Sequence, residues 1–356
     1  MLQDRGYSAR NRRIKSMDVE SYQDFIVGFR RWTYGAMDKA ASSRADALLD
    51  EMKLNSPDAP LHAFRDVFLA DPLIRARIRV WLSSQQLMWR CVQDHYQQHA
   101  DYYLSEMSEA DNAGPGTLEL NPGMAMPDYT QHEIHLQPGG YTGNPFAGPL
   151  YHYGTNAFYG NNADDDEFHI ALANMVAVPA DGKVEKIVDL GCGIGRVSAA
   201  LAQRFPQAET WGLDVGGPLV RYAHFRARDL GILVHFAQRL AEATGFEDNS
   251  VDLVNAYILF HEVPQDAVRA ICAEAYRIIR PGGVFDVSDF PTGQFAPKQP
   301  YKRFMRWIDH VYNAERWSHD FVYCDFLEIM QSVGFEVEKA ENRHLIVTGY
   351  VGRKPA

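Results

Sequence analysis

The sequence has little cysteine and little positive charge, and each shortage excludes a class of protein. Four of its 356 residues are cysteine, and no two of them are spaced as CxxC. A disulfide framework is therefore not expected, and the thiols fit a reduced, cytoplasmic protein. Lysine and arginine number 35 against 46 acidic residues, which gives a net charge of -11. Because no net positive field would attract phosphates, we expect no nucleic-acid partner.

Long apolar runs are also missing, as are internal repeats and low-complexity tracts. No uninterrupted apolar stretch is long enough to cross a bilayer, so we expect no membrane span. The chain is nevertheless 46% hydrophobic, which is too apolar for a disordered protein. Its length suggests two domains, or one domain with a large extension.

The composition divides the chain into three parts. Residues 1–112 place apolar residues three and four apart and predict a mostly helical N-terminal domain, in which Asp71 and Pro72 are typical of a helix start. These helices could cover a substrate or form a homodimer interface. Residues 113–165 are rich in glycine, proline and aromatic residues and predict an irregular segment rather than a helix. Such a segment either forms a lid over an active site or wraps the surface of a domain.

Residues 166–356 alternate between strand and helix patterns. This alternation predicts an α/β fold with a doubly wound, seven-stranded sheet that carries helices on both faces. A short polar turn separates the last two strand candidates, so the last strand is expected to be antiparallel. The candidates are residues 186–190, 209–213, 233–236, 251–256, 284–288, 336–338 and 345–349.

Residues 186–200, KIVDLGCGIGRVSAA, carry the functional prediction. A short apolar strand leads to Asp189, glycines at 191, 193 and 195 make a tight turn, and a helix follows. Glycine permits positive φ and lets the backbone approach a ligand closely. This first turn of a doubly wound sheet is where cofactors bind. The spacing differs from the GxGxxG of dinucleotide-binding proteins.

The D-L-G-C-G-x-G pattern resembles motif I of class I S-adenosylmethionine (SAM)-dependent methyltransferases. The chain is similar to the UbiE-like, small-molecule branch over residues 166–353, because T-W-G-L-D at 210–214 and R-P-G-G at 280–283 follow in the family's order. The resemblance implies a Rossmann-like domain that binds SAM. It assigns the cofactor loop to Asp189, Gly191, Cys192, Gly193 and Gly195.

The other predicted cofactor contacts come from the same resemblance. Asp214 would hold the SAM ribose, since a carboxylate offers two acceptor oxygens to two hydroxyls. Leu240 stands where the family commonly has an aspartate, so we expect Leu240 and Ala241 to contact the adenine through backbone groups and apolar packing. Asn255 and Tyr257 would face the methionine moiety. Tyr153 or Phe158 could contact the sulfonium by a cation–π interaction.

Methyl transfer to a hydroxyl needs a group that removes a proton. His261, which follows the fourth strand, is the candidate base because imidazole titrates near neutral pH. Glu262 could orient it, and Asp289 at the end of the fifth strand could touch the substrate. The alternative is that His261 caps the next helix or packs against the sheet.

No metal site is predicted. His132 and His135 form an HxxH among helix-breaking residues, not the HExxH of a zinc-protease helix.

Taken with the resemblance, the sequence predicts a SAM-dependent enzyme that methylates a small or medium organic acceptor, with O-methylation preferred over C- or N-methylation. A SAM-binding protein that catalyses another reaction is the alternative. Methylation of bases or proteins is disfavoured, since N-A-Y-I at 255–258 does not match the N-P-P-Y signature.

Overall fold

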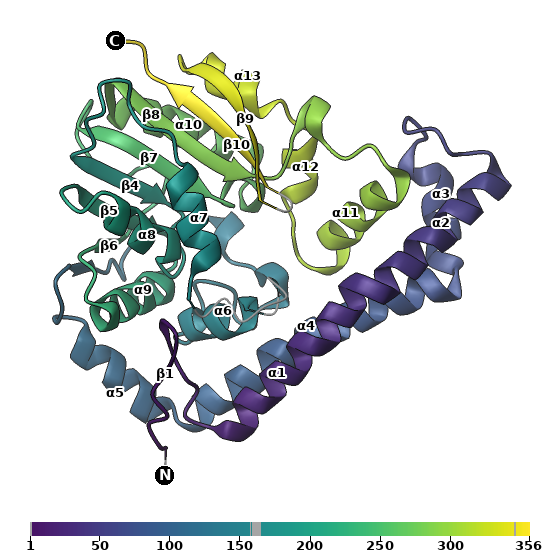
Figure 1. Ribbon diagram of the computed structural model, residues 1–356, viewed down its shortest axis with the longest axis horizontal. Coiled ribbons are helices and arrows are strands. Elements are labelled where there is room, and N and C mark those ends of the chain that lie inside the picture. Colours follow the sequence, from purple (N-terminus) through teal and green to yellow (C-terminus); the bar gives the residue numbers. More distant parts are fainter. Residues whose placement is uncertain (1, 157, 159–164, 345–346) are drawn as a thin grey trace.

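An open mixed sheet lies at the centre of the computed structural model, and a long helical arm lies beside it (Figure 1). The structure describes residues 2–156, 158, 165–344 and 347–356. The strand order is β3-β6-β5-β4-β7-β8-β10-β9. The strands are β3 (Leu118–Glu119), β4 (Lys186–Leu190), β5 (Glu209–Asp214), β6 (His235–Gln238), β7 (Val251–Tyr257), β8 (Ile279–Asp289), β9 (Glu336–His344) and β10 (Val347–Arg353).

The topology confirms the predicted α/β, Rossmann-like sheet with an antiparallel last strand. Strands β4 to β8 are parallel, and β10 runs antiparallel to both β8 and β9. One strand of the central sheet was not predicted, because β3 has only two residues and lies in the glycine- and proline-rich segment, where it pairs with β6. A separate antiparallel pair near the N-terminus, β1 (Tyr7–Ser8) and β2 (Asn11–Arg12), was not predicted either. The start of the predicted strand at 345–349 lies outside the described residues.

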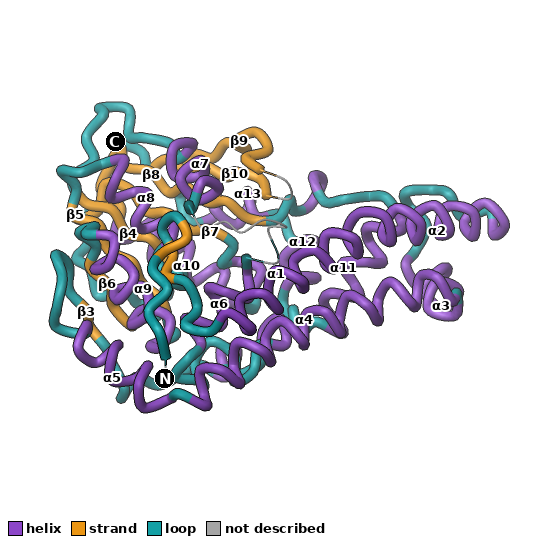
Figure 2. The backbone as a smooth tube through the Cα atoms, turned by 60° about the horizontal axis from the view of Figure 1, so that its bottom comes forward, coloured by secondary structure: helices purple, strands orange, loops and turns teal. Residues whose placement is uncertain are grey.

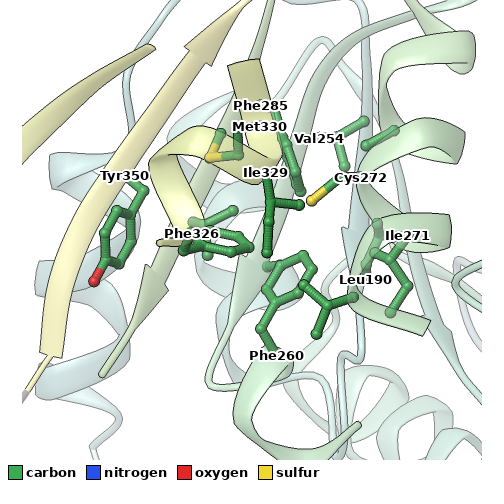
Figure 3. Packing of buried hydrophobic residues seen from close by; sticks show 14 of the residues in the cluster. Leu190, Val254, Phe260, Ile271, Cys272, Phe285, Phe326, Ile329, Met330 and Tyr350 are labelled. Carbon is green, nitrogen blue, oxygen red and sulfur yellow. The ribbon is translucent and has the colours of Figure 1, made fainter. Parts of the chain in front are cut away.

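Helices cover both faces of the sheet, so its central strands β4 and β7 are buried over nearly their whole length. One face carries α7 (Glu167–Met175), α8 (Arg196–Arg204) and α9 (Gly217–Leu230). The other carries α10 (Gln265–Ile278), α12 (Ser318–Tyr323) and α13 (Phe326–Ser332). Figure 3 shows the second face, where Phe260, Phe285 and Phe326 meet above the strands.

The N-terminal residues form an arm of two antiparallel helical rods (Figure 2). The first rod is α1 (Met17–Trp32), a π-helical turn (Thr33–Met37) and α2 (Asp38–Met52); the second is α4 (Pro72–Gln98). Asp71 caps α4 by accepting hydrogen bonds from the backbone N–H of Leu73 at 3.0 Å and of Ile74 at 3.2 Å, which confirms the predicted helix start. Between the rods lies α3 (Leu61–Ala70), and α5 (Ala100–Ala110) leads back to α9.

The arm shares its core with later parts of the chain. In α11 (Pro300–Tyr312), Phe304 packs edge-on against Phe68 of α3 with ring centroids 5.2 Å apart. Helix α6 (Ala147–Thr155) fills the space between α4 and α9. Residues 1–112 therefore bury their apolar surface partly against elements outside that range, and the boundaries at 112 and 165 stay a prediction.

Segment 113–165 is not wholly irregular. Helix α6 lies within it, contrary to the prediction, because Pro149 falls in the first helical turn, where its missing N–H costs no hydrogen bond. Two short 3₁₀ turns, Asp128–Thr130 and Ile134–Leu136, precede α6. Among the described residues, no helix is both long enough and apolar enough to cross a membrane.

Candidate active site

A cavity opens at the carboxyl ends of β4, β5 and β7. Ligands of doubly wound sheets bind at this edge, where the chain switches direction across the sheet. The floor and the wall on the sheet side include most of the residues predicted to bind SAM. These are Gly191, Cys192, Gly193, Asp214, Leu240, Ala241 and Tyr257, together with Glu262.

The glycine turn presents its backbone to this cavity. Gly191, Gly193 and Gly195 all have positive φ, at 64°, 53° and 72°. A Cβ at Gly195 would come within 2.6 Å of the Phe236 ring, so this glycine is required for packing. A Cβ at Gly193 would meet no described atom within 4 Å. The inner edge of the turn at Gly193 is therefore open space that a ligand can approach.

Asp214 is fixed at the end of β5 by that same turn. Its Oδ2 accepts a hydrogen bond from the backbone N–H of Gly193 at 2.9 Å, and its Oδ1 accepts one from Gly216 at 2.8 Å. Burial raises the pKa of this carboxyl, and the two amide hydrogen bonds oppose that effect. Each oxygen retains a further lone pair on the cavity side, which suits the two hydroxyls of a ribose.

Asp189 and Asn255 hold the site together from behind. Nδ2 of Asn255 donates to Oδ1 of Asp189 at 2.6 Å, and the Ser198 hydroxyl donates to the other carboxylate oxygen. Burial raises the pKa of Asp189 to about 6 against the effect of those two donors. Neither residue is among the described residues that line the cavity. Their contact with SAM stays a prediction. In the structure, their hydrogen bonds connect β4 to β7 and to α8.

Described residues of segment 113–165 form part of the cavity wall. Tyr129, His135, Tyr141 and Tyr151 line it, and the Tyr129 hydroxyl donates to the Glu242 carboxylate. A lid function for the segment stays a prediction. The sequence signalled an aromatic cover but not which aromatic residues would face inward.

Tyr153 and Phe158 are not among the described lining residues. The Tyr153 hydroxyl donates to the Arg12 carbonyl at 2.7 Å, and Phe158 packs edge-on against Trp89 with ring centroids 5.8 Å apart. Two residues apart on α6, Tyr151 and Tyr153 project from different sides of the helix. A role for Tyr153 or Phe158 at the sulfonium stays a prediction without a contact to the cavity.

The structure brings His261 and Asp289 together. Nδ1 of His261 lies 2.7 Å from Oδ1 of Asp289, whose Oδ2 accepts the backbone N–H of Phe260 at 2.8 Å. Burial lowers the pKa of His261, but Asp289, Glu262 and Glu315 outweigh it and raise the pKa to about 9. Imidazolium is therefore the resting form at neutral pH. Both side chains lie just behind the cavity wall, and Glu262 is the neighbour that reaches the cavity.

His135 links two carboxylates in front of this pair. Its Nδ1 lies 2.8 Å from Oε1 of Glu315, and its Nε2 lies 3.3 Å from Oε1 of Glu262. Burial opposes the charge on His135, yet the two carboxylates raise its pKa well above the usual range. Sequence reasoning considered His135 only together with His132, and nothing in the sequence connects it to Glu315, which is 180 positions further on.

Comparison with known proteins agrees with this geometry. Residues 187–283 match a family model described as a methyltransferase domain. These residues form a class I SAM-dependent methyltransferase domain. The family match covers the glycine turn, Asp214 and His261, and the cofactor of the domain is SAM. The open edge at Gly193 and the fixed carboxylate of Asp214 are a suitable cradle for it.

Three curated relatives of the methyltransferase domain differ in their named reactions. The demethylmenaquinone methyltransferase of Thermus thermophilus is 34% identical over 107 residues, which is 30% of this chain and 48% of the relative. The sterol 24-C-methyltransferase of Neurospora crassa is 29% identical over 174 residues, 48% of this chain and 44% of the relative. The ubiquinone biosynthesis O-methyltransferase of Pseudomonas entomophila is 32% identical over 100 residues, 28% of this chain and 41% of the relative. The chain thus spans about half the length of the curated relatives that it matches.

Proposed function

We propose that the protein transfers a methyl group from SAM to a small or medium organic acceptor, with a hydroxyl oxygen as the leading acceptor atom. The observation that carries this proposal is that one cavity is lined by the glycine turn, by Asp214 and by Glu262. A cofactor cradle and an acid–base cluster therefore share one space. When bound, SAM supplies a methyl group that its sulfonium already activates for attack.

The chain's own residues would bind the cofactor at the sheet edge. Asp214 would hold the ribose, and the backbone of the turn at Gly191 and Gly193 would approach the cofactor's carboxylate end. Leu240 and Ala241 line the cavity where the resemblance places the adenine. Tyr257 lines the same cavity, and we assign it to the methionine moiety.

The acceptor would occupy the end of the cavity that the aromatic cover closes. Ile134 and Tyr141 would supply apolar walls there and exclude water from the reacting atoms. The cover is anchored to the arm, because Gln85 and Trp89 of α4 each donate a hydrogen bond to the His135 carbonyl at 2.8 Å. The helical arm thus supports the acceptor side of the site.

Proton removal is assigned to His261. With Nδ1 facing Asp289, Nε2 is the nitrogen that faces Glu262 and Glu315, at 3.6 Å and 4.0 Å from their nearest oxygens. An acceptor hydroxyl placed between those carboxylates would give its proton to Nε2 of the neutral imidazole as the oxygen–carbon bond forms and the carbon–sulfur bond breaks. Because the pKa of His261 is raised to about 9, this neutral form is the minor one at neutral pH, and methyl transfer should become faster as the pH rises toward 9. Asp289 would hold the imidazole in the orientation that this transfer needs.

The relatives support methyl transfer more broadly than they support one acceptor atom, since their names include both a C- and an O-methyltransferase. C- or N-methylation of a natural-product-like metabolite is therefore the second candidate, and it would use the same cofactor cradle. A non-methylation reaction on bound SAM is the third.

Native mass spectrometry of the freshly purified protein is the direct test. Bound SAM or its demethylated product supports the cofactor half of the proposal, and incubation of SAM labelled in its methyl group with a panel of hydroxylated, amine and enolisable acceptors then identifies the acceptor atom. Absence of binding after SAM is added would overturn the proposal. Product formation with unconsumed SAM would favour the non-methylation alternative.

Self-association through the arm stays a prediction. Phe25, Phe29 and Trp32 stack along α1 with ring centroids about 6 Å apart, and Phe25 and Trp32 are exposed. The same native spectrum gives the mass of the oligomer.

A further inference from the structure

We propose that His135, Glu262 and Glu315 form a binding site for one divalent first-row metal ion at the acceptor end of the cavity. Each of the three side chains offers one ligand atom, and these atoms all lie within 4.8 Å of one another. They come from three separate elements: the 3₁₀ turn Ile134–Leu136, the 3₁₀ turn Phe260–Glu262 and the loop that follows α11.

Glu315 provides the observation that points to a ligand. Its side chain is 1% exposed, and its Oε2 has no hydrogen-bond partner among the described residues. A buried carboxylate oxygen without a partner is costly, and such a group calls for an explanation such as a bound ion. Oε2 faces the same space as Nε2 of His261, which lies 4.0 Å away.

The donor set indicates the kind of ion. One imidazole and two carboxylates suit Mn²⁺, Fe²⁺, Co²⁺ or Zn²⁺ better than a soft ion such as Cu⁺, which prefers sulfur ligands. Three protein ligands leave coordination positions open. His135 and Glu262 line the cavity, so the open positions would face the acceptor rather than the protein interior.

Neighbouring residues hold His135 in place. Nδ2 of Asn313 lies 3.2 Å from Nδ1 of His135, and it also donates to the Asp309 carboxylate at 2.8 Å. Gln85 donates both to the Asn313 side chain and to the His135 carbonyl. Such outer contacts orient metal ligands in known sites. The sequence shows only the HxxH at His132 and His135, whereas these partners come from positions far apart in the chain.

The competing explanation is an ion pair without metal. Both nitrogens of His135 face carboxylates, so a doubly protonated imidazole could join Glu262 to Glu315. That arrangement leaves Oε2 of Glu315 unsatisfied, whereas an ion between the three side chains would contact it. The two explanations predict different effects of Glu315→Gln on metal affinity. If the cluster binds a metal ion, the variant loses a ligand and binds the ion more weakly; if the cluster is only an ion pair, metal affinity does not depend on Glu315.

The ion's role toward the acceptor rests on the proposed function, whereas its binding does not. An ion here would bind an acceptor oxygen beside Nε2 of His261. It would favour acceptors with two adjacent oxygens that can chelate, such as a catechol or a 2-hydroxy or 2-oxo acid. Monohydroxylated acceptors with no neighbouring oxygen would be poorer substrates.

Mn²⁺ alone is the probe for the test. The full chain is freed of metal with a chelator, and Mn²⁺ is titrated while electron paramagnetic resonance counts the free ion. We expect one bound Mn²⁺ per chain, and Zn²⁺ should displace it. Glu315→Gln should weaken Mn²⁺ binding by more than about tenfold. Glu242→Gln is the matched control, since Glu242 lines the same cavity but bonds Tyr129 rather than the cluster, and it should leave Mn²⁺ affinity unchanged.

Two results would overturn the metal site. One is that neither Mn²⁺ nor Zn²⁺ binds at millimolar concentration. The other is that Glu315→Gln binds Mn²⁺ as the unaltered chain does. Thermal unfolding checks that the variant is folded, and His135→Gln provides a second ligand variant with the same expectation.

SAM affinity measured by calorimetry without metal separates this inference from the proposed function. If SAM binds and its methyl group is transferred while no metal binds, the metal site is wrong and the function stands. If Mn²⁺ binds through Glu315 and SAM does not, the site stands and the methyl-transfer proposal is wrong.

Discussion

His261 and Asp289 tie the ends of two neighbouring strands together, with Nδ1 of the imidazole 2.7 Å from Oδ1 of the carboxylate. His261 follows β7 and Asp289 ends β8, so the pair depends on the sheet register that places Tyr257 beside Ser288. The contact leaves one imidazole nitrogen for chemistry and fixes where it points. The ring also packs on Phe290, as the packing alternative for His261 expects, so the choice between a base and a packing residue stays open to the first prediction below.

The first prediction concerns this pair as a unit. Asp289→Asn and His261→Gln should each lower kcat by about a hundredfold or more, while the Kd for SAM stays within about twofold. Because Asp289 acts through His261, the double variant should be hardly slower than either single variant. Steady-state kinetics and calorimetry measure both quantities, with thermal unfolding to check the fold. Losses in kcat that add in the double variant would show that the two residues act independently.

The second prediction concerns Asp214. Asp214→Ala removes the carboxylate that we assign to the SAM ribose, and it should weaken SAM binding by about a hundredfold or more, since hydrogen bonds to a charged group contribute about 1.5–3 kcal/mol each. Asp214→Asn, which keeps one acceptor oxygen, should lie between this variant and the unaltered chain. Calorimetric titration with SAM gives the affinities. Unchanged SAM affinity in a folded Asp214→Ala protein would contradict the assignment.

The third prediction contrasts two glycines of the same turn. Gly193→Ala adds a methyl group that meets no described protein atom, so it should reduce SAM affinity and cost only about 1 kcal/mol of stability for its positive φ. Gly195→Ala places its methyl group 2.6 Å from the Phe236 ring. In addition to the cost of positive φ, this overlap should lower the free energy of unfolding by about 1–3 kcal/mol. Denaturant unfolding and SAM titration of both variants test the contrast. Equal stability losses would show that the turn does not face open space at Gly193.

Contiguous features of the sequence were enough to predict the sheet and the cofactor end of the site. The glycine turn, Asp214 and residues 240–241 belong to short stretches whose strand and helix neighbours are local, and the structure places them along one cavity. Their roles toward SAM remain predictions that the variants above test.

The acceptor end could not be predicted in the same way. His135 and Glu315 meet only because α11 packs on the arm and the aromatic segment is anchored to α4. No local pattern encodes such a contact. The place of Tyr153 before the glycine turn predicts a contact with the cofactor, but the unpredicted helix α6 directs its hydroxyl to the Arg12 carbonyl. Helix formation through glycine and proline depends there on burial against α4 and α9, which residue propensities do not report.

The fourth prediction concerns Asp166, which joins the N-terminal tail to the sheet domain. Its carboxylate is 1% exposed and forms ion pairs with Arg10, Arg196 and Arg226. Asp166→Ala would leave buried guanidinium groups without their acid, and it should lower the free energy of unfolding by about 3–5 kcal/mol. Asp165→Ala is the matched control on the exposed neighbour and should change stability by less than about 1 kcal/mol. Denaturant unfolding of both variants provides the measurement, and similar values would show that the buried cluster is not stabilising.

The fifth prediction is a pH dependence of stability that originates at His95. Nε2 of His95 on α4 lies 2.8 Å from the Tyr103 hydroxyl on α5, and burial, with a smaller contribution from His99, lowers the pKa of His95 to about 4. Above pH 6.5, near the pKa of an unfolded histidine, this group is neutral in both states and costs nothing. As the pH falls from 6.5 towards 4, the unfolded chain takes up a proton that the folded chain does not, so the free energy of unfolding decreases.

His95→Gln removes that proton uptake while keeping a polar partner for Tyr103. Its stability should therefore fall less steeply than that of the unaltered chain between pH 6.5 and 4, and the two slopes should agree above pH 7. Burial also lowers the pKa values of His152 and His169. The free energy of unfolding of the variant should therefore still decrease as the pH falls, but by less than that of the unaltered chain. Denaturant unfolding at several pH values measures the slopes. Identical slopes below pH 6.5 would mean that His95 is protonated in the folded protein, and that the contact between α4 and α5 does not exclude a charge.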